Sequence, residues 1–142
     1  MNEDRIVNEM IDMLFLKKWR KRLKHDFIEK KKEREDRYFR YHNGEYIDEL
    51  LVVEKVNQMP EEYTVKRLLE LGAEKRCFLL AKGVSGVFTL EVGIEEAYTC
   101  GLGAVIYCGN GVGYFQGEQC YGSPERWILV NKNKRGQEDL FG

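Results

Sequence analysis

The apolar positions over residues 3–37 recur with the period of an α-helix, and this segment contains neither glycine nor proline. Its first part is apolar nearly all round, which favours burial on several sides. Further along, the apolar side chains narrow to one arc of the helix, made of Phe15, Leu16, Trp19, Leu23 and Phe27. The pattern therefore predicts one long helix over 3–37 that is amphipathic in its middle.

An Asn-Gly pair at 43–44 follows this helix and has aromatic-rich flanks. Asn-Gly favours a type I′ turn, because both central residues of that turn need a positive φ. We therefore expect a short hairpin over 38–47, with a second strand that extends through 50–53.

A second helix is predicted over 60–71. Pro60 and the two glutamates after it are typical of a first helical turn, where proline is tolerated and acidic side chains are favoured. The buried face of this helix is expected to consist of Val65, Leu68 and Leu69. Gly72 then supplies the left-handed residue that ends many helices.

From Ala73 onward the pattern becomes that of β-strands separated by turns rich in Gly, Asn, Ser and Pro. The predicted strands are 76–81, 87–92, 104–108, 114–121 and 126–130. Residues 94–100 fit either a helical turn or further strand. The glycine-rich segments 101–103 and 109–113 are interpreted as hairpin turns, because neither matches the GxxxxGK[ST] phosphate loop.

Helices followed by strands predict an α+β fold, in which an N-terminal helical half packs on a C-terminal antiparallel sheet of about five strands. We expect a helical arm over 1–37 and an α+β domain over 38–142. The arm either packs on the sheet or pairs with a second copy in a homodimer. Both helices are expected to cover one face of the sheet, above Phe78, Leu80, Phe88, Leu90, Ile106, Ile128 and Val130.

The composition of the 142 residues fits a folded domain, with 43% hydrophobic and 33% charged residues. No apolar run approaches the ~18–20 residues of a membrane-spanning helix. The net charge of −1 conceals a strong polarisation, because residues 17–40 carry +7 and the rest of the chain carries −8. A basic segment beside an acidic body is either self-complementary or suited to a partner of opposite charge.

The four cysteines, Cys77, Cys100, Cys108 and Cys120, contain no CxxC pair. This spacing predicts neither a zinc knuckle nor a thioredoxin-type redox pair, and we expect no metal and no cofactor. Buried, reduced cysteines and a cytoplasmic location are the expectation, with a disulfide as the alternative.

The sequence does not predict a catalytic site. The two histidines, His25 and His42, have no motif that brings them near Cys100, which is the one cysteine beside flexible glycines. The adjacent glutamates at 61–62 and 95–96 diverge by about 100° on a helix, so neither pair makes a carboxylate site by itself. A hydrolase or transferase with Cys100 as nucleophile remains an alternative.

The basic helix face is the most specific functional feature. Its candidate macromolecule-binding residues are Lys17, Lys18, Arg20, Lys21, Arg22 and Lys24. We expect a small non-enzymatic interaction protein that binds another protein, of the inhibitor, immunity or adaptor type that phages and mobile elements also encode. Nucleic acid is the alternative partner, with stacking platforms at Tyr107, Tyr114, Phe115, Tyr121 and Trp127. A third alternative is an anionic membrane surface, with Met13–Leu16 and Trp19 inserted.

Overall fold

A computed structural model describes residues 2–41, 44–118, 122–133 and 136–142. The helical elements are α1 (Glu3–Leu14), α2 (Lys17–Lys24), the π-helical η1 (His25–Glu29), the 3-10 turn η2 (Lys31–Glu33), α3 (Arg34–Phe39), the 3-10 turn η3 (Glu49–Leu51), α4 (Glu61–Glu70) and α5 (Leu90–Thr99). The strands are β1 (Val52–Lys55), β2 (Arg76–Ala81), β3 (Val84–Thr89), β4 (Ala104–Tyr107), β5 (Val112–Gln116) and β6 (Arg126–Val130).

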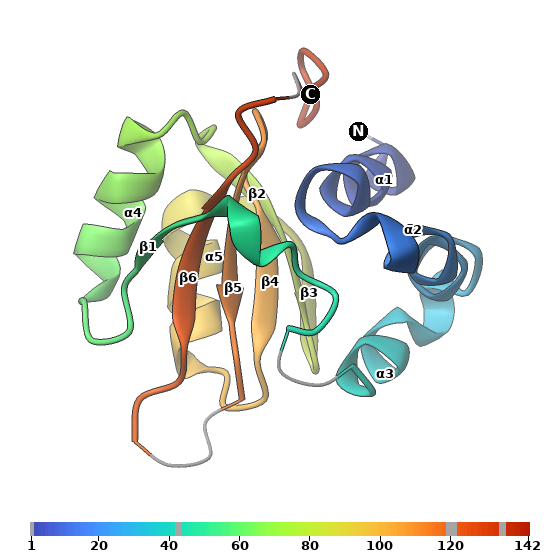
Figure 1. Cartoon of the computed structure of the whole chain (residues 1–142), viewed down its shortest axis with the longest axis horizontal. Coiled ribbons are helices and arrows are strands. Elements are labelled where there is room, and N and C mark those ends of the chain that lie inside the picture. Colours follow the sequence, from blue (N-terminus) through green and yellow to red (C-terminus); the bar gives the residue numbers. More distant parts are fainter. Residues whose placement is uncertain (1, 42–43, 119–121, 134–135) are drawn as a thin grey trace.

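These elements confirm the predicted α+β fold. The described strands form one antiparallel sheet of six strands, in the order β1-β6-β5-β4-β2-β3. The sheet lies between two helical layers, with α1, α2 and α3 on one side and α4 and α5 on the other (Figure 1). The extra strand is β1, which pairs with β6 at the edge of the sheet rather than forming part of a hairpin with residues 38–41.

Both faces of the sheet are covered by helices. Phe78, Leu80 and Tyr107 point toward α1–α3 and belong to the first core. Their neighbours Leu79 and Ile106 point to the opposite face and belong to the second core, beneath α4 and α5. This alternation follows from the two-residue period of a strand, and it buries the central strands from both sides.

The prediction that both helices cover one face of the sheet is therefore wrong. Phe78 and Leu80 lie beneath the N-terminal helices, as expected. The other predicted core side chains belong to the second core: Phe88, Leu90, Ile106, Ile128 and Val130. Among these, Leu90 is not on a strand at all, because it begins α5.

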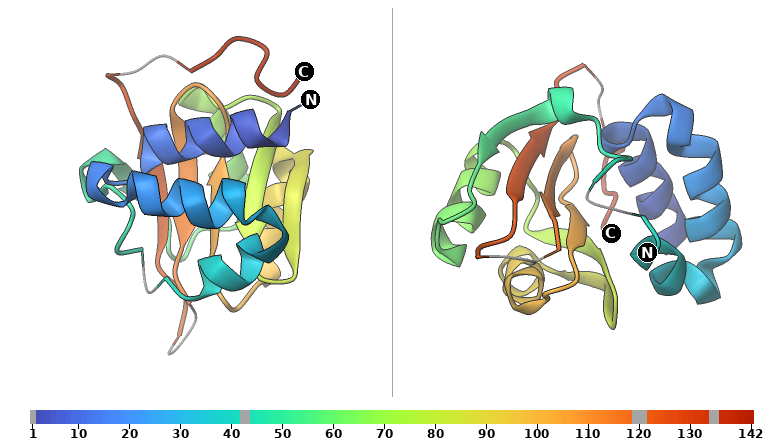
Figure 2. Two further views of the ribbon diagram at one scale, coloured as in Figure 1. Left: turned by 90° about the vertical axis from the view of Figure 1, so that its right-hand side faces the viewer. Right: turned by 60° about the horizontal axis from the view of Figure 1, so that its bottom comes forward.

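The single long helix predicted over 3–37 is also wrong. The chain leaves the helix at Phe15, whose backbone is extended, and α2 begins two residues later. Tertiary hydrogen bonds hold this break, because the Leu16 amide donates to the Tyr46 carbonyl at 2.8 Å and the Asp48 amide donates to the Leu14 carbonyl at 3.0 Å. The break turns α2 back alongside α1, so that α1, α2 and α3 lie side by side over the sheet (Figure 2). In this way an apolar segment that no single helix face could bury is covered on several sides.

The predicted hairpin over 38–47 is not formed, because Tyr38 and Phe39 are the end of α3. Tyr38 is buried and makes edge-to-face contacts with Phe27 and Tyr46, at centroid distances of 6.1 and 6.0 Å. These aromatic contacts within the first core hold the segment better than an isolated hairpin would. Residues 42–43 of the expected turn lie outside the described residues.

In the second half of the chain, α4, β2 and β6 match their predictions. The strand predicted at 87–92 ends at Thr89 instead, and 90–99 is helical throughout. Thr89 caps α5, since its hydroxyl accepts from the Val92 amide at 3.4 Å. A turn at Gly109–Gly111 joins β4 to β5 as predicted, but β5 already begins at Val112 and ends at Gln116, so the predicted turn over 109–113 is too long and the strand predicted over 114–121 is shifted; residues 119–121 lie outside the described residues. Residues 101–103 join α5 to β4 and are not a hairpin turn.

Candidate functional site: a basic helix face and an acidic groove

The predicted basic residues lie on α2, and most of them face outward. Lys17, Lys18, Lys21 and Arg22 are exposed on one side of the helix. Within the described part of the chain, none of these four side chains forms a salt bridge. The opposite side of α2 packs into the first core through Leu23. The predicted amphipathic helix is thus present, although it is shorter than expected.

Two of the predicted residues are engaged within the chain. Arg20 is half-buried and donates from Nε to the Phe15 carbonyl at 3.1 Å, which caps the end of α1. Lys24 forms a salt bridge of 2.9 Å with Asp12 and so ties α2 to α1. The outward cationic face therefore consists of Lys17, Lys18, Lys21 and Arg22.

The four described aromatic platforms expected for nucleic acid are not on the surface. Tyr107, Tyr114, Phe115 and Trp127 are all buried in the two cores. Tyr121 lies outside the described residues. Met13, Leu14 and Phe15, expected at a membrane in the third alternative, are buried in the first core as well. Among the helices of the described residues, none combines the length and the apolar character that crossing a membrane requires.

A second surface, which sequence reasoning missed, lies between α4 and α5. It is a groove of about 530 Å³ lined by Val65, Leu69, Lys66 and five glutamates, Glu61, Glu62, Glu70, Glu91 and Glu95. Leu69 is 41% exposed, a large fraction for a leucine on a helix that faces the protein. The glutamates come from both helices, so the groove combines an apolar floor with an acidic rim.

The local sequence explains this arrangement. The predicted buried face of α4 is wrong at Leu69, because the buried positions are Thr64 and Leu68, whereas Val65 is half-buried and Leu69 is exposed. In α5 the buried positions Leu90, Ile94 and Ala97 turn Glu91 and Glu95 outward. The signal that sequence reasoning missed is the helical spacing of the buried positions in α5, because residues 94–100 taken alone fit either a helical turn or a strand.

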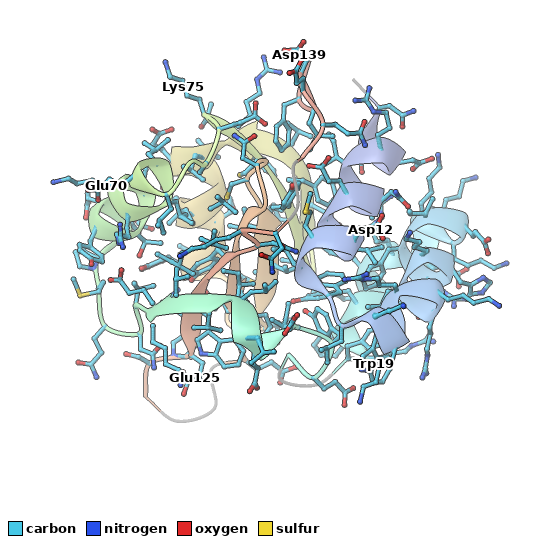
Figure 3. The ribbon with its side chains drawn as sticks, turned by 45° about the horizontal axis from the view of Figure 1, so that its top comes forward. Asp12, Trp19, Glu70, Lys75, Glu125 and Asp139 are labelled. Carbon is cyan, nitrogen blue, oxygen red and sulfur yellow. The ribbon has the colours of Figure 1, made fainter. Side chains whose placement is uncertain are left out.

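Figure 3 shows how far apart the two surfaces are. Glu70 of the acidic groove and Trp19 of α2 lie on opposite sides of the molecule, with the sheet between them. The ion pairs of the basic segment agree with this separation. Lys24 pairs with Asp12, Arg34 pairs with Glu3, and Arg37 pairs with Asp26, all on the same side of the sheet. These ion pairs tie the basic segment to its own side of the sheet, and none of them reaches the acidic groove.

The structure gives no support to Cys100 as a nucleophile. Its thiol is half-buried and donates to the Gly103 carbonyl at 3.7 Å. His25 pairs with Glu29 at 2.6 Å in the other helical layer, and His42 lies outside the described residues. Cys77, Cys100 and Cys108 are free thiols. Burial raises the pKa of Cys77 to about 12 and that of Cys108 well above its ordinary value, which keeps both thiols protonated.

Among the described residues, no cluster of three or more His, Cys, Asp or Glu side chains is placed to hold a metal ion. Known protein families, curated proteins and solved structures contain no match to this chain. The two surfaces are therefore the features from which a function can be inferred.

Proposed function

We propose that this chain binds another protein, and that the acidic groove between α4 and α5 is where the partner docks. The supporting observation is the combination of an apolar floor at Val65 and Leu69 with five glutamates around it. Within the described residues, none of these glutamates forms a salt bridge. Like charges gathered around an apolar surface favour a partner that supplies the opposite charge.

The chemistry of the groove specifies its occupant. A groove between two helices is a common docking site for an amphipathic helix, whose apolar stripe fills the floor. Here the flanking positions of that helix should be lysine or arginine, because they meet the glutamate rim. Nucleic acid does not fit, since its phosphates would be repelled by the same glutamates.

A second copy of this chain is a poor occupant. The basic helix α2 packs Leu23 into its own core and Trp19 partly against it, and its exposed side chains are all charged, at Lys17, Lys18, Lys21 and Arg22. It therefore has no apolar stripe to place on Val65 and Leu69. The occupant we propose is a basic amphipathic segment of a different protein. By covering that segment, this chain would act as an inhibitor, immunity or adaptor protein.

The test selects peptides from a displayed library of random sequences against the immobilised full-length chain. The enriched peptides are expected to carry apolar residues at helical spacing flanked by lysine or arginine. A Glu70→Lys/Glu95→Lys variant should bind them about tenfold more weakly, because both reversed charges lie on the groove rim. Neither position is in the first turn of its helix, so the favourable acidic first turns are kept.

The matched control is Glu49→Lys/Glu138→Lys, which changes the net charge equally at two exposed positions outside the groove. This control should bind the selected peptides about as well as the unmodified chain. Enrichment without a cationic bias, equal weakening by both double variants, or no enrichment at all would each reject the proposal.

A further inference from the structure

A second pocket lies in the N-terminal helical layer, at the edge of the cationic face of α2. It has a volume of about 200 Å³ and is lined by three arginines, Arg22, Arg37 and Arg40, together with Trp19, Asp26, Tyr41 and Glu45. These residues come from α2, η1, the end of α3 and the segment after it. Trp19, labelled in Figure 3, marks its side of the molecule, away from Glu70 and the acidic groove.

One carboxylate organises the inner wall of this pocket. Asp26 is only 8% exposed and accepts hydrogen bonds from Arg37 Nη1 at 2.8 Å and from the Tyr41 hydroxyl. Burial opposes ionisation of Asp26, but these two hydrogen bonds, together with the positive charges of Arg37 and His25, hold the pKa of Asp26 below its ordinary value. Asp26 is thus an ionised group whose acceptors are occupied by the protein, and it fixes the position of Arg37.

Arg22 is held in a different way. Its guanidinium lies over the rings of Trp19 and Tyr41, with its Cζ atom 5.5 and 5.8 Å from the two ring centroids. The two rings meet edge to face at 5.9 Å. Cation–π contact restricts the orientation of the flat guanidinium, which carries five N–H donors.

Donors exceed acceptors in this pocket. The three guanidinium groups, the indole of Trp19 and the hydroxyl of Tyr41 all donate, and only Asp26 and Glu45 carry a carboxylate. Two of the donor atoms, Trp19 Nε1 and Arg37 Nε, are buried and have no hydrogen-bond partner among the residues that the structure describes. Buried donors in folded proteins are nearly always paired, so a pocket with spare donors suits a ligand rich in acceptor oxygens.

We infer that this pocket binds a phosphate monoester. Arginine forks match the oxygen geometry of phosphate, and a phosphate presents several strong acceptors in a small volume. The exposed Lys17, Lys18 and Lys21 continue the positive face along α2, so the phosphate can belong either to a small molecule or to the end of a nucleic-acid strand. This inference does not depend on the proposed protein partner, because the sheet separates the two sites.

The experiment follows the indole N–H resonance of Trp19 by NMR during titration of the full chain. The Trp127→Phe variant assigns that resonance. The probes are inorganic phosphate, adenosine monophosphate, and one single-stranded oligonucleotide with and without a 5′-phosphate. Saturable shifts are expected with inorganic phosphate, adenosine monophosphate and the 5′-phosphorylated strand. A preference for the 5′-phosphorylated strand over adenosine monophosphate points to a nucleic-acid end, and equal affinity points to a small ester; both outcomes support a phosphate site.

Three single substitutions sharpen the test. Arg22→Gln should weaken binding about fivefold or more, and it leaves the Asp26–Arg37 pair intact. Glu45→Gln should strengthen binding, because it removes a negative charge from the pocket lining. Lys75→Gln, which removes one exposed positive charge away from Trp19 (Figure 3), should leave the affinity unchanged.

Three results would overturn the inference: no saturable shift with inorganic phosphate, adenosine monophosphate or the 5′-phosphorylated strand, equal weakening by Arg22→Gln and Lys75→Gln, or equal binding of the two oligonucleotides with none of the small phosphates. The last result would mean that α2 attracts the nucleic-acid backbone without a phosphate pocket.

Discussion

Replacing Gly93 with alanine should displace α5 from the sheet, because this glycine lies directly against Cys77 of β2. A Cβ atom built on Gly93 would lie 2.4 Å from the Cys77 Sγ atom, far inside ordinary contact distance. Both residues are buried, so neither can move toward solvent without disturbing the second core. The contact also positions the acidic groove, since α5 supplies Glu91 and Glu95.

Two opposing effects set the size of the change. Alanine is favoured over glycine in a helix interior by about 1 kcal/mol. Overpacking a buried contact costs about 1–3 kcal/mol, and the upper end applies here because Sγ ends a short side chain that has no room to swing away. We therefore expect Gly93→Ala to lower the free energy of unfolding by about 1–2 kcal/mol. In a Cys77→Ala background the sulfur is gone, and the same substitution should instead stabilise by up to about 1 kcal/mol.

Urea unfolding followed by circular dichroism measures all four members of this double-mutant cycle. The coupling free energy between the two positions should be about 2–3 kcal/mol. Gly101→Ala is the control, because nothing lies within 4 Å of a Cβ at that position, and it should change stability by less than about 0.5 kcal/mol. If Gly93→Ala stabilises the unmodified chain, or costs the same in both backgrounds, the close packing of α5 on β2 is wrong.

The remaining predictions concern a buried carboxylate and the thiols. Asp26→Asn should lower the free energy of unfolding by about 1–3 kcal/mol at neutral pH, because Arg37 and Tyr41 lose an ionised acceptor. Since the pKa of Asp26 is depressed in the folded chain, this loss of stability should be full at pH values above the ordinary pKa of 3.8 and should vanish as the pH falls through the folded pKa. Urea unfolding of both chains at neutral pH and at a pH below the folded pKa measures the loss, and an equal loss at the two pH values contradicts the prediction. In a Cys120→Ser variant, a thiol reagent at neutral pH should leave Cys77 and Cys108 unlabelled until the chain unfolds, and one rapidly labelled Cys100 would revive the nucleophile hypothesis.

Local signals predicted those elements whose ends are marked by residues with a fixed backbone preference. Pro60 and Gly72 bracket α4, and the turn at Gly109–Gly111, with positive φ at all three residues, separates β4 from β5. The sequence also contained the signal for α5, because Thr89 is a good cap and the buried positions of the helix have helical spacing. That signal was obscured by the apolar residues at 87–92, which fit a strand equally well.

The break between α1 and α2 had no such local signal. Phe15 and Leu16 are compatible with a helix, and no glycine or proline stands near them. The break is held by hydrogen bonds to Tyr46 and Asp48, about thirty residues further along the chain. A tertiary contact of this kind overrides helix propensity, and it cannot be found from the local pattern.

The charge count showed that the chain is polarised, but it could not show which charges are available to a partner. Only the fold reveals that Arg20 and Lys24 are used to fasten α2 to α1, whereas Lys17, Lys18 and Lys21 face solvent. The same holds for the negative charges. Because α4 and α5 lie on the far side of the sheet from α2, the basic segment over 17–40 is not beside the glutamates of the groove, whose one cationic lining residue among those described is Lys66 (Figure 1). A self-complementary arrangement is thus absent between these two surfaces, and charge complementarity at the groove has to come from another molecule.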